Sequence, residues 1–308
     1  MHFDDDGTGR VRLRDGGAVL AEYVYRPVEP RIESPRSYAL LRTRGGLDAT
    51  AYRPDDHVWH KGLSLALPVV GEHNFWGGPS YRRGVGYVQL PNNGAQVHRA
   101  FAHADGPLDA ARIEETLDWS SADGEPVLGE RRSLTARPVD EATWALTWRS
   151  ALRNRTAAPL AFGSPTTEGR DNAGYAGLFW RGPSLFTGGD IVAPGGPVGD
   201  AARGEPGPWL AFQAPAADVG VLMLDAADPV TPAGNPWFAR SAEYAGLNPA
   251  PFFFHETVLP PGGTLVLAAA VVVGDRDVAR HADTVGATLV AELRHPASVA
   301  AHTPEEVA

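Results

Sequence analysis

The sequence predicts an all-β fold, a large two-sheet antiparallel β-sandwich with one C-terminal helix. The 308 residues include 35 glycines and 27 prolines, which is too many for a helical bundle and suits short strands joined by many turns. Apolar and polar residues also alternate with period two along much of the chain, which is typical of strands. Many strands in one body must bury their apolar faces on each other, and two packed sheets do this economically.

Individual strands are marked by this alternation. The clearest stretches are residues 112–119, 127–139, 143–149, 218–224 and 264–273. In the third stretch, Trp144, Leu146 and Trp148 share one face. The last two stretches are apolar almost throughout, as expected for strands that are buried on both faces. Glycine- and proline-rich turn signals separate the strands, and we expect roughly fourteen to eighteen of them.

One helix is expected near the C-terminal end, over residues 277–294. Apolar residues recur there at spacings of four, three, four and four, which is one stripe at helical period: Val278, Ala282, Val285, Leu289 and Leu293. We expect a single β-sandwich domain over 1–275, the helix packed on it within 276–295, and a tail over 296–308. The glycine- and proline-rich stretch 183–208 is interpreted as a long loop or ordered lid, because such loops are usually functional.

Composition and charge exclude several classes of protein. The formal net charge is −10, and no cluster of basic residues offers the counterion release that a nucleic-acid partner requires. The sequence has no cysteine, which excludes disulfides and thiolate catalysis. No apolar run is long enough to span a membrane, and the acidic first residues do not resemble a secretory signal. We therefore expect a cytoplasmic protein with no membrane partner.

Polar and aromatic residues gather between positions 56 and 98. Histidine, asparagine and tryptophan alternate there with glycines, which indicates loops that present hydrogen-bonding groups beside flat rings. A sugar needs this combination, because its hydroxyls require directional partners and its C–H face packs on a ring. We predict that His57, His60 and Lys61 are catalytic. Substrate binding is predicted for Asp56, His73, Asn74, Trp76 and His98. Six side chains should converge on one concave face, joined by Glu168, Arg170 or Glu256 from the second half of the chain: His57, His60, Lys61, His73, Trp76 and His98.

Lys61 is the only lysine among 27 basic residues. This ratio suggests a coding bias that converts interchangeable lysines into arginines, so the remaining lysine is expected to do what arginine cannot. We expect its ammonium to hold a substrate oxygen or the charge of an enolate in the cleft. A Lys61→Arg variant should then lose turnover with little loss of stability. The alternative is that a single lysine remained by chance.

The second half of the chain adds carboxylates and arginines beside aromatic residues. We predict that Glu168 and Glu256 are catalytic and that Arg170, Arg181 and Trp237 bind substrate. A carboxylate next to aromatic rings is a suitable place for a raised pKa and acid–base work. The alternative for each carboxylate is a salt bridge with a neighbouring arginine.

A divalent metal site remains an alternative at this stage. His57 and His60 are three residues apart, so they could share a metal only from a loop or a helical turn. Asp56, His73 and His98 could supply further ligands. The metal assignment is therefore left unknown. No dinucleotide-binding or P-loop motif occurs, so we expect no organic cofactor.

Four motifs carry a resemblance to a known family. They are DHVWHKG at 56–62, NFWGGP at 74–79, GLFWRGP at 177–183 and NPWF at 235–238. Together they resemble an actinobacterial branch of a family of unknown function that is often labelled "methane oxygenase PmoA", over roughly residues 15–275. The label implies a membrane copper subunit, which does not suit a chain without a membrane span. Family members more often show Asp-His-Pro-His-His in the first motif, and here Lys61 takes a position where histidine is common.

The resemblance implies the galactose-mutarotase-like supersandwich, whose members act on or bind carbohydrates. In mutarotases a histidine and a late glutamate form the acid–base pair, and Glu256 lies at a similarly late position. We therefore predict an enzyme that performs epimerisation, or elimination or hydrolysis next to a carbonyl, on a sugar or keto-sugar. The alternatives are a non-catalytic carbohydrate-binding protein of the same fold and a divalent-metal-dependent sugar enzyme. A homo-oligomer is compatible with either.

Overall fold

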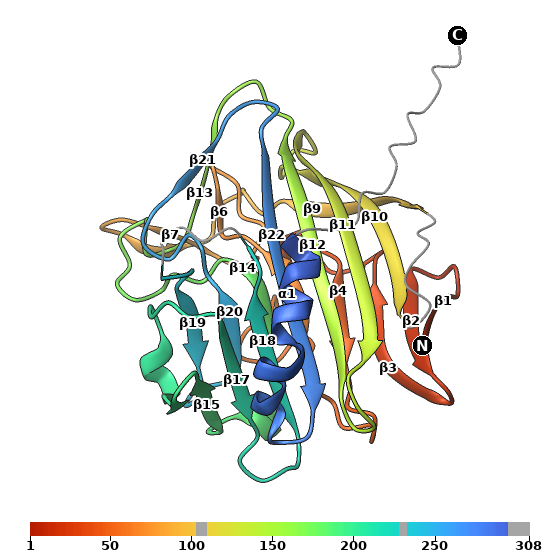
Figure 1. Ribbon diagram of the computed structural model, residues 1–308. Helices are drawn as coiled ribbons and strands as arrows, with labels where there is room; N and C mark the ends of the chain where they lie inside the picture. Colours follow the sequence, from red (N-terminus) through yellow and green to blue (C-terminus); the bar gives the residue numbers. More distant parts are fainter. Residues whose placement is uncertain (103–109, 228–232, 295–308) are drawn as a thin grey trace.

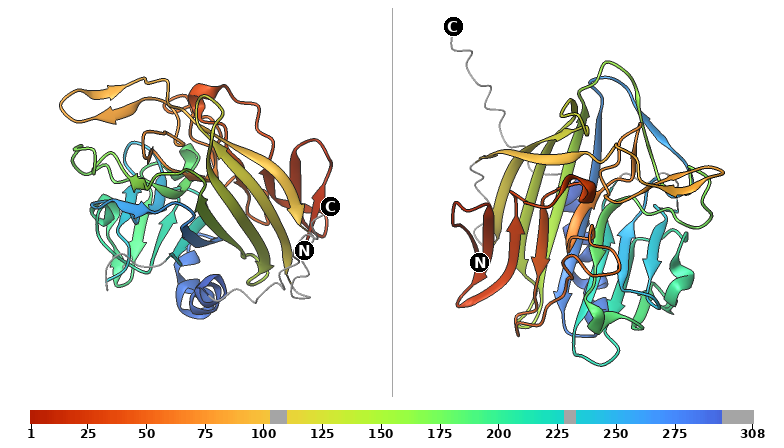
Figure 2. Two further views of the ribbon diagram at one scale, coloured as in Figure 1. Left: turned by 90° about the horizontal axis from the view of Figure 1, so that it is seen from above. Right: turned by 180° about the vertical axis from the view of Figure 1, so that it is seen from behind.

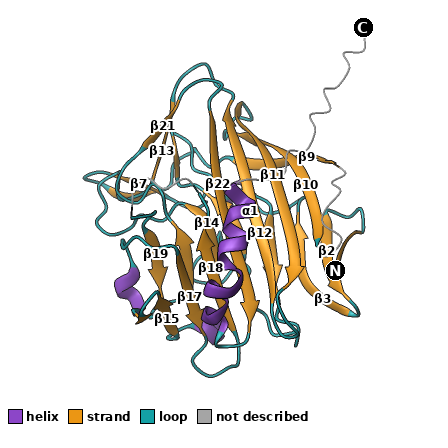
Figure 3. Ribbon diagram, in the orientation of Figure 1, coloured by secondary structure: helices purple, strands orange, loops and turns teal. Residues whose placement is uncertain are grey.

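The chain folds as two large antiparallel β-sheets that pack face to face, with one C-terminal helix on the outside (Figure 1, Figure 3). This confirms the predicted fold class. The computed structural model describes residues 1–102, 110–227 and 233–294. One sheet has eight strands, in the order β1 (His2–Asp5), β2 (Arg10–Asp15), β3 (Ala18–Val24), β4 (Tyr38–Leu41), β5 (Leu63–Ala66), β14 (Gly177–Arg181), β20 (Gly246–Pro249) and β19 (Trp237–Arg240).

The second large sheet has nine strands. Their order is β16 (Gly196–Pro197), β15 (Asp190–Ala193), β17 (Trp209–Gln213), β18 (Gly220–Asp225), β22 (Thr264–Gly274), β12 (Trp144–Asn154), β11 (Pro126–Pro138), β10 (Ala111–Ser120) and β9 (Ala95–Ala102). Two small sheets complete the fold, one of β21 (Thr257–Leu259), β13 (Leu160–Gly163) and β6 (Val69–Val70), the other of β7 (Ser80–Arg82) and β8 (Gly86–Val88). Short 3-10 turns cover Arg31–Glu33, Ser184–Phe186 and Gly199–Ala202.

Alternation along the strands places the main core between the two sheets. Trp144 and Trp148 from β12 are buried there, and so is Trp180 from β14 of the opposite sheet. The predicted shared face of β12 is therefore confirmed. Strand β22 is buried on both sides, because Val271 faces this core while Val272 faces the helix.

The C-terminal helix is shorter and less regular than predicted. Helix α1 covers Ala287–Arg294, and it is preceded by a π-helical turn at Ala282–Gly286 and a 3-10 turn at Val278–Arg280. Leu289 and Leu293 are buried against the outer face of the nine-stranded sheet, so the apolar stripe still decides the packing (Figure 2). Gly286 lies where an added Cβ would be 2.6 Å from Leu224, so the irregular turn lets the chain approach the sheet closely.

Two further predictions need correction. The described residues form 22 strands, more than predicted, because several strands of two to four residues carry no readable alternation. The stretch 183–208 is not one long loop, since it contains β15 and β16 at the edge of the nine-stranded sheet. The predicted tail, 296–308, lies outside the described residues. None of the helices described is long and apolar enough to cross a membrane.

Candidate functional site

An aromatic cavity lies on the outer face of the eight-stranded sheet, near its β14–β20–β19 end. Leu178 and Trp180 of β14 point into the core between the sheets, so the alternate residue Phe179 points outward to the cavity side. The cavity has a volume of ≈ 280 Å³. We call it the aromatic cavity, and its lining residues are His57, Trp59, His60, Trp76, Gly77, Pro79, Tyr87, Arg170, Ala173, Tyr175, Phe238, Arg240 and Tyr244.

A tight loop places Trp76 in the cavity wall. The Asn74 side-chain oxygen accepts hydrogen bonds from the backbone N–H groups of Trp76 (2.8 Å) and Gly77 (3.0 Å), which fixes the turn. Gly77 has a φ of +105°, and a Cβ there would be 2.6 Å from the Cβ of Trp59. Only glycine allows this approach. Asn74 was predicted to bind substrate, and it is buried as the residue that holds this loop.

Four polar side chains form a connected group at one side of the cavity. Arg181 on β14 donates to both carboxylate oxygens of Asp56 at 2.8 Å and to Nδ1 of His60 at 3.2 Å. Oδ2 of Asp56 also forms a hydrogen bond with Nδ1 of His57, at 2.9 Å. The rings of His57 and His60 stack in parallel, with centroids 4.6 Å apart.

These contacts fix the proton positions on both imidazoles. A guanidinium only donates, so His60 Nδ1 must accept, and a neutral His60 carries its proton on Nε2. A carboxylate only accepts, so His57 donates through Nδ1–H and its Nε2 is the nitrogen that can take up another proton. This Nε2 forms no hydrogen bond with the described part of the chain. Asp56 thus orients His57 as a base at the cavity wall.

The surroundings lower the pKa values of both His60 and Asp56. Burial lowers the pKa of His60 well below its ordinary value, and the nearby charges of His57 and Arg181 lower it further. Burial alone would raise the pKa of Asp56, but hydrogen bonds from His57 and Arg181 outweigh it and the pKa is lowered. His60 is therefore neutral and Asp56 is ionised near neutral pH.

A second polar group, made of tyrosines, lies in the same cavity wall. The hydroxyls of Tyr87 and Tyr175 are 2.7 Å apart, and Arg170 donates to the Tyr87 hydroxyl. Burial, together with Tyr87, raises the pKa of Tyr175 well above its ordinary value. Tyr175 therefore keeps its proton and can act as a donor. Its ring also packs on Trp76, with centroids 4.5 Å apart.

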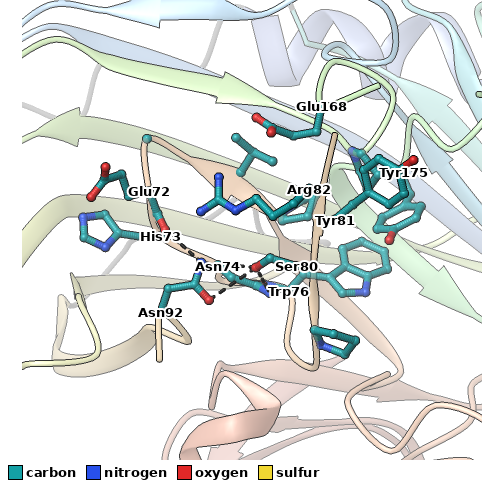
Figure 4. A pocket seen from close by; sticks show the side chains of 15 residues that line it. Glu72, His73, Asn74, Trp76, Ser80, Tyr81, Arg82, Asn92, Glu168 and Tyr175 are labelled. Atoms are coloured by element: carbon teal, nitrogen blue, oxygen red, sulfur yellow. Dashed lines mark hydrogen bonds between the residues drawn. The ribbon is translucent and has the colours of Figure 1, made fainter. Parts of the chain in front are cut away.

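A smaller hollow adjoins the cavity (Figure 4). It has a volume of ≈ 20 Å³ and shares Trp76 and Tyr175 with the aromatic cavity. Besides Trp76, three predicted site residues line it: His73, Asn74 and Glu168. Figure 4 shows the hydrogen bonds by which Asn74 and Asn92 hold Ser80 in its wall. Burial lowers the pKa of His73.

Lys61 lies behind the cavity and does not belong to its lining. Its side chain is 1% exposed, and its ammonium pairs with Glu33 and donates to the Val58 carbonyl at 3.0 Å. Burial lowers the pKa of Lys61 to about 8, although Glu33 acts in the opposite direction. Glu33 also pairs with Arg53 at 2.7 Å. Lys61, Glu33 and Arg53 thus form a cluster of paired charges beneath the loop that carries His57 and His60.

Three other predicted residues do not line the cavity. His98 lies on β9 of the other sheet, where its Nδ1 contacts Glu115 at 2.7 Å. Trp237 is buried in the core between the sheets, because β19 turns its neighbours Phe238 and Arg240 to the cavity instead. Glu256 is exposed, next to Gly163. Of the six residues predicted to converge, only His57, His60 and Trp76 line the cavity, and His73 lies in the adjoining hollow. Of the three predicted to join them, Arg170 lines the cavity and Glu168 lines the hollow.

Sequence reasoning missed several residues of the cavity. Tyr87, Tyr175 and Tyr244 were not singled out, and each lies in or beside a short element between loops. Two of them directly follow a glycine, as Gly86-Tyr87 and Gly174-Tyr175. A glycine–tyrosine pair in a loop is the signal that could have found them, since it marks an aromatic ring presented from a tight turn.

The described residues contain no group of three or more histidine, aspartate or glutamate side chains that could hold a metal ion. His57 and His60 instead use Asp56 and Arg181 as partners for Nδ1. The cavity therefore offers bases, hydroxyls and guanidinium groups beside aromatic rings. That set can bind a polar ligand and move a proton.

The sequence matches a family of unknown function, DUF6807, over residues 10–286, so the chain belongs to this family. The description of the family names no activity, and the methane oxygenase label is not part of it. No curated protein matches the chain.

Similar solved structures include three bacterial proteins. The α-galactosidase from Lactobacillus brevis is 9% identical with a TM-score of 0.42, over 83% of this chain and 38% of that one. A mutant of heparan sulfate lyase HepC from Pedobacter heparinus is 9% identical with a TM-score of 0.36, over 89% and 37%. The Slr1438 protein from Synechocystis sp. PCC 6803 is 12% identical with a TM-score of 0.37, over 90% and 95%. This chain thus spans well under half of the first two proteins, and TM-scores this low say nothing about its activity.

Proposed function

We propose that this protein is an enzyme that performs acid–base chemistry on a sugar or keto-sugar, at a carbon next to a carbonyl group, in the aromatic cavity. The observation that carries the proposal is the Asp56–His57 pair. The carboxylate holds Nδ1–H at 2.9 Å, which leaves Nε2 of a cavity-lining imidazole as the base. A binding protein needs no such base, because hydroxyl groups can be held by neutral side chains.

The walls suit a sugar. Trp76, Tyr175 and Phe238 surround the cavity with flat rings, on which the C–H face of a pyranose can pack. The volume of ≈ 280 Å³ lies near the small end of the range for ligand sites. A ligand of one or two sugar rings is therefore favoured over a long chain.

The reaction follows from the two proton-transfer groups. His57 Nε2 takes the proton from the carbon next to the carbonyl, and the electron pair of that C–H bond moves to the carbonyl oxygen as an enolate. Tyr175, which is protonated at neutral pH, then donates its proton either to that carbon or to a departing oxygen, while the electron pair of the enolate forms the new C–H bond or the C=C bond that expels this oxygen. The proton on His57 then returns to Tyr175 through solvent, which restores both groups. The first path is an epimerisation and the second an elimination, and neither requires a further reactant.

The test is turnover by the purified protein on a panel of glycosides, 3-keto-glycosides and uronic acids, followed by product analysis. His57→Gln should bind the active compound with unchanged affinity but turn it over far more slowly. Asp56→Asn is the companion variant, since it keeps the shape of the side chain but no longer fixes the Nδ1–H form of His57. Binding of a sugar without turnover by the wild type would favour a non-catalytic carbohydrate-binding protein.

A further inference from the structure

The described side chains that line the aromatic cavity include positive charges and no negative one. Its described lining residues include Arg170 and Arg240, and none of them is a carboxylate. Two further guanidinium groups lie just behind the rings, with Arg181 4.0 Å from the centroid of Tyr244 and Arg203 5.7 Å from that of Phe238. These two are paired with carboxylates, Arg181 with Asp56 and Arg203 with Asp200, so the uncompensated charge belongs to the lining arginines. A concave site with charge of one sign and apolar walls selects ligands of the opposite charge.

Arg170 and Arg240 line the cavity with charge that the described residues compensate only weakly. Within the described part of the chain, the Arg170 side chain pairs with no carboxylate; its guanidinium donates to the hydroxyl of Tyr87 and lies over the ring of that residue. Arg240 pairs with Glu243, whose side chain is 71% exposed, and Arg240 Nε is buried with no hydrogen-bond partner among these residues. A buried donor without a partner is costly unless a ligand satisfies it.

The charges also act on one another. Burial lowers the pKa of Arg203, and the neighbouring charges of Arg240 and Arg170 lower it further. Arginines that repel one another around a cavity are stabilised when an anion binds in it. A planar carboxylate suits them, because a guanidinium presents two parallel N–H donors to its two oxygens.

We propose that the sugar bound in the aromatic cavity carries a carboxylate, as a uronic acid does, and that Arg170 and Arg240 bind this group. The inference rests on the function proposed above, since it names the substrate class of the same site. It also fits the chemistry. The carboxylate supplies the carbonyl group next to the reacting carbon, and the two arginines offset the charge that moves onto its oxygens when His57 removes the proton.

The test is calorimetric titration with methyl glucuronide and methyl galacturonide against the matching neutral methyl glycosides. Uronides should bind at least about 10-fold more tightly, and Arg170→Gln or Arg240→Gln should weaken only the uronides, by about 10- to 100-fold. Arg99→Gln is the matched control, because Arg99 lies on β9 with its side chain 58% exposed. Added salt should weaken uronide binding to the wild type and leave neutral glycosides unaffected, which provides a readout that needs no variant.

Two results would overturn the inference. One is equal affinity for uronides and neutral glycosides, and the other is a preference for sugar sulfates that survives both substitutions. Turnover of a neutral keto-sugar without any preference for uronides would leave the proposed enzyme intact and refute the anion site alone. Tight, arginine-dependent binding of uronides without turnover would support the anion site and refute the enzyme.

Discussion

Two regions of this protein are both rich in ionisable groups and differ in whether the hydrogen-bonding atoms of those groups all have partners. The first is the histidine side of the aromatic cavity, with Asp56, His57, His60 and Arg181. The second lies between the sheets, and we call it the core network: Tyr23, Gln96, His98, Glu115, Glu130 and Arg132. In the core network Arg132 meets Glu130 at 2.7 and 2.8 Å, Tyr23 at 2.8 Å and Gln96 at 3.0 Å.

The comparison shows that the density of charged residues does not identify a site. Arg132 and Glu130 have side chains that are 0% exposed and pair fully with each other and their neighbours. The His57 side chain is 37% exposed, and only its Nδ1 is occupied. A closed network stabilises and orders a core, whereas an open nitrogen beside a cavity can react.

The largest effect on turnover is expected at His57, whose Nε2 is open to the cavity. His57→Gln should reduce turnover by about 10²- to 10⁴-fold, the range of general base catalysis, and should leave the melting temperature unchanged because the side chain is partly exposed. Steady-state kinetics with the compound found in the turnover panel, beside a melting curve, provide the measurement. Unchanged turnover would remove the distinction between the two regions.

A substitution in the core network should lower stability and leave turnover unchanged, the opposite of the result expected for His57. Arg132→Met leaves the Glu130 carboxylate buried without its main partner, so the free energy of unfolding should fall by about 3–5 kcal/mol. Urea denaturation measures this change, and the turnover of the protein that remains folded should equal that of the wild type. Arg99→Met, at an exposed position, is the control that should hardly alter stability. A stable Arg132→Met variant with lost turnover would place the core network in the reaction.

A variant of Lys61 distinguishes the catalytic role expected from the sequence from the structural role that its buried location indicates. Its side chain is 1% exposed and pairs with Glu33, so the larger guanidinium of Lys61→Arg should cost about 1–3 kcal/mol of stability through overpacking. Turnover per folded molecule should be retained. Measured together, denaturation and kinetics separate this outcome from the one expected for a lysine in the cleft, in which turnover is lost and stability kept.

The smallest effect concerns the pH dependence of stability. The fold keeps the pKa of His60 well below its ordinary value of 6.5, so below that pH the unfolded chain binds a proton that the folded chain does not. The free energy of unfolding therefore falls as the pH is lowered through 6.5. His60→Gln should show a shallower fall than the wild type in urea denaturation between pH 7 and pH 5. Parallel curves would mean that folding does not change the pKa of His60, which would contradict the lowered value.

Prediction from sequence succeeded where local periodicity determines structure. The alternation in β12 and the apolar stripe of the C-terminal segment both identify the buried faces, because strand and helix geometry fix which residues share a side. The pattern could not identify β16, which has two residues, nor the irregular turns before α1, which depend on the close contact between Gly286 and Leu224.

The site was predictable only in part, for the same reason. The segment 56–62 contributes His57 and His60 to one wall, since both lie on one loop. Trp237 and Phe238 were indistinguishable in the sequence, and which of them faces the cavity depends on the register of β19. Tyr175 and Arg240 reach the cavity through contacts between distant segments, and no short-range pattern contains that information.

The central claim is that His57 removes a proton from carbon in the aromatic cavity, and proton NMR in deuterium oxide tests it most directly. The protein is incubated with the uronide that it binds, and the signal of the C–H next to the carboxylate is followed. We expect this signal to disappear with the wild type, by exchange or by elimination, and to persist with His57→Gln. A signal that persists with the wild type while the sugar is bound, or that disappears equally fast with His57→Gln, would contradict the claim.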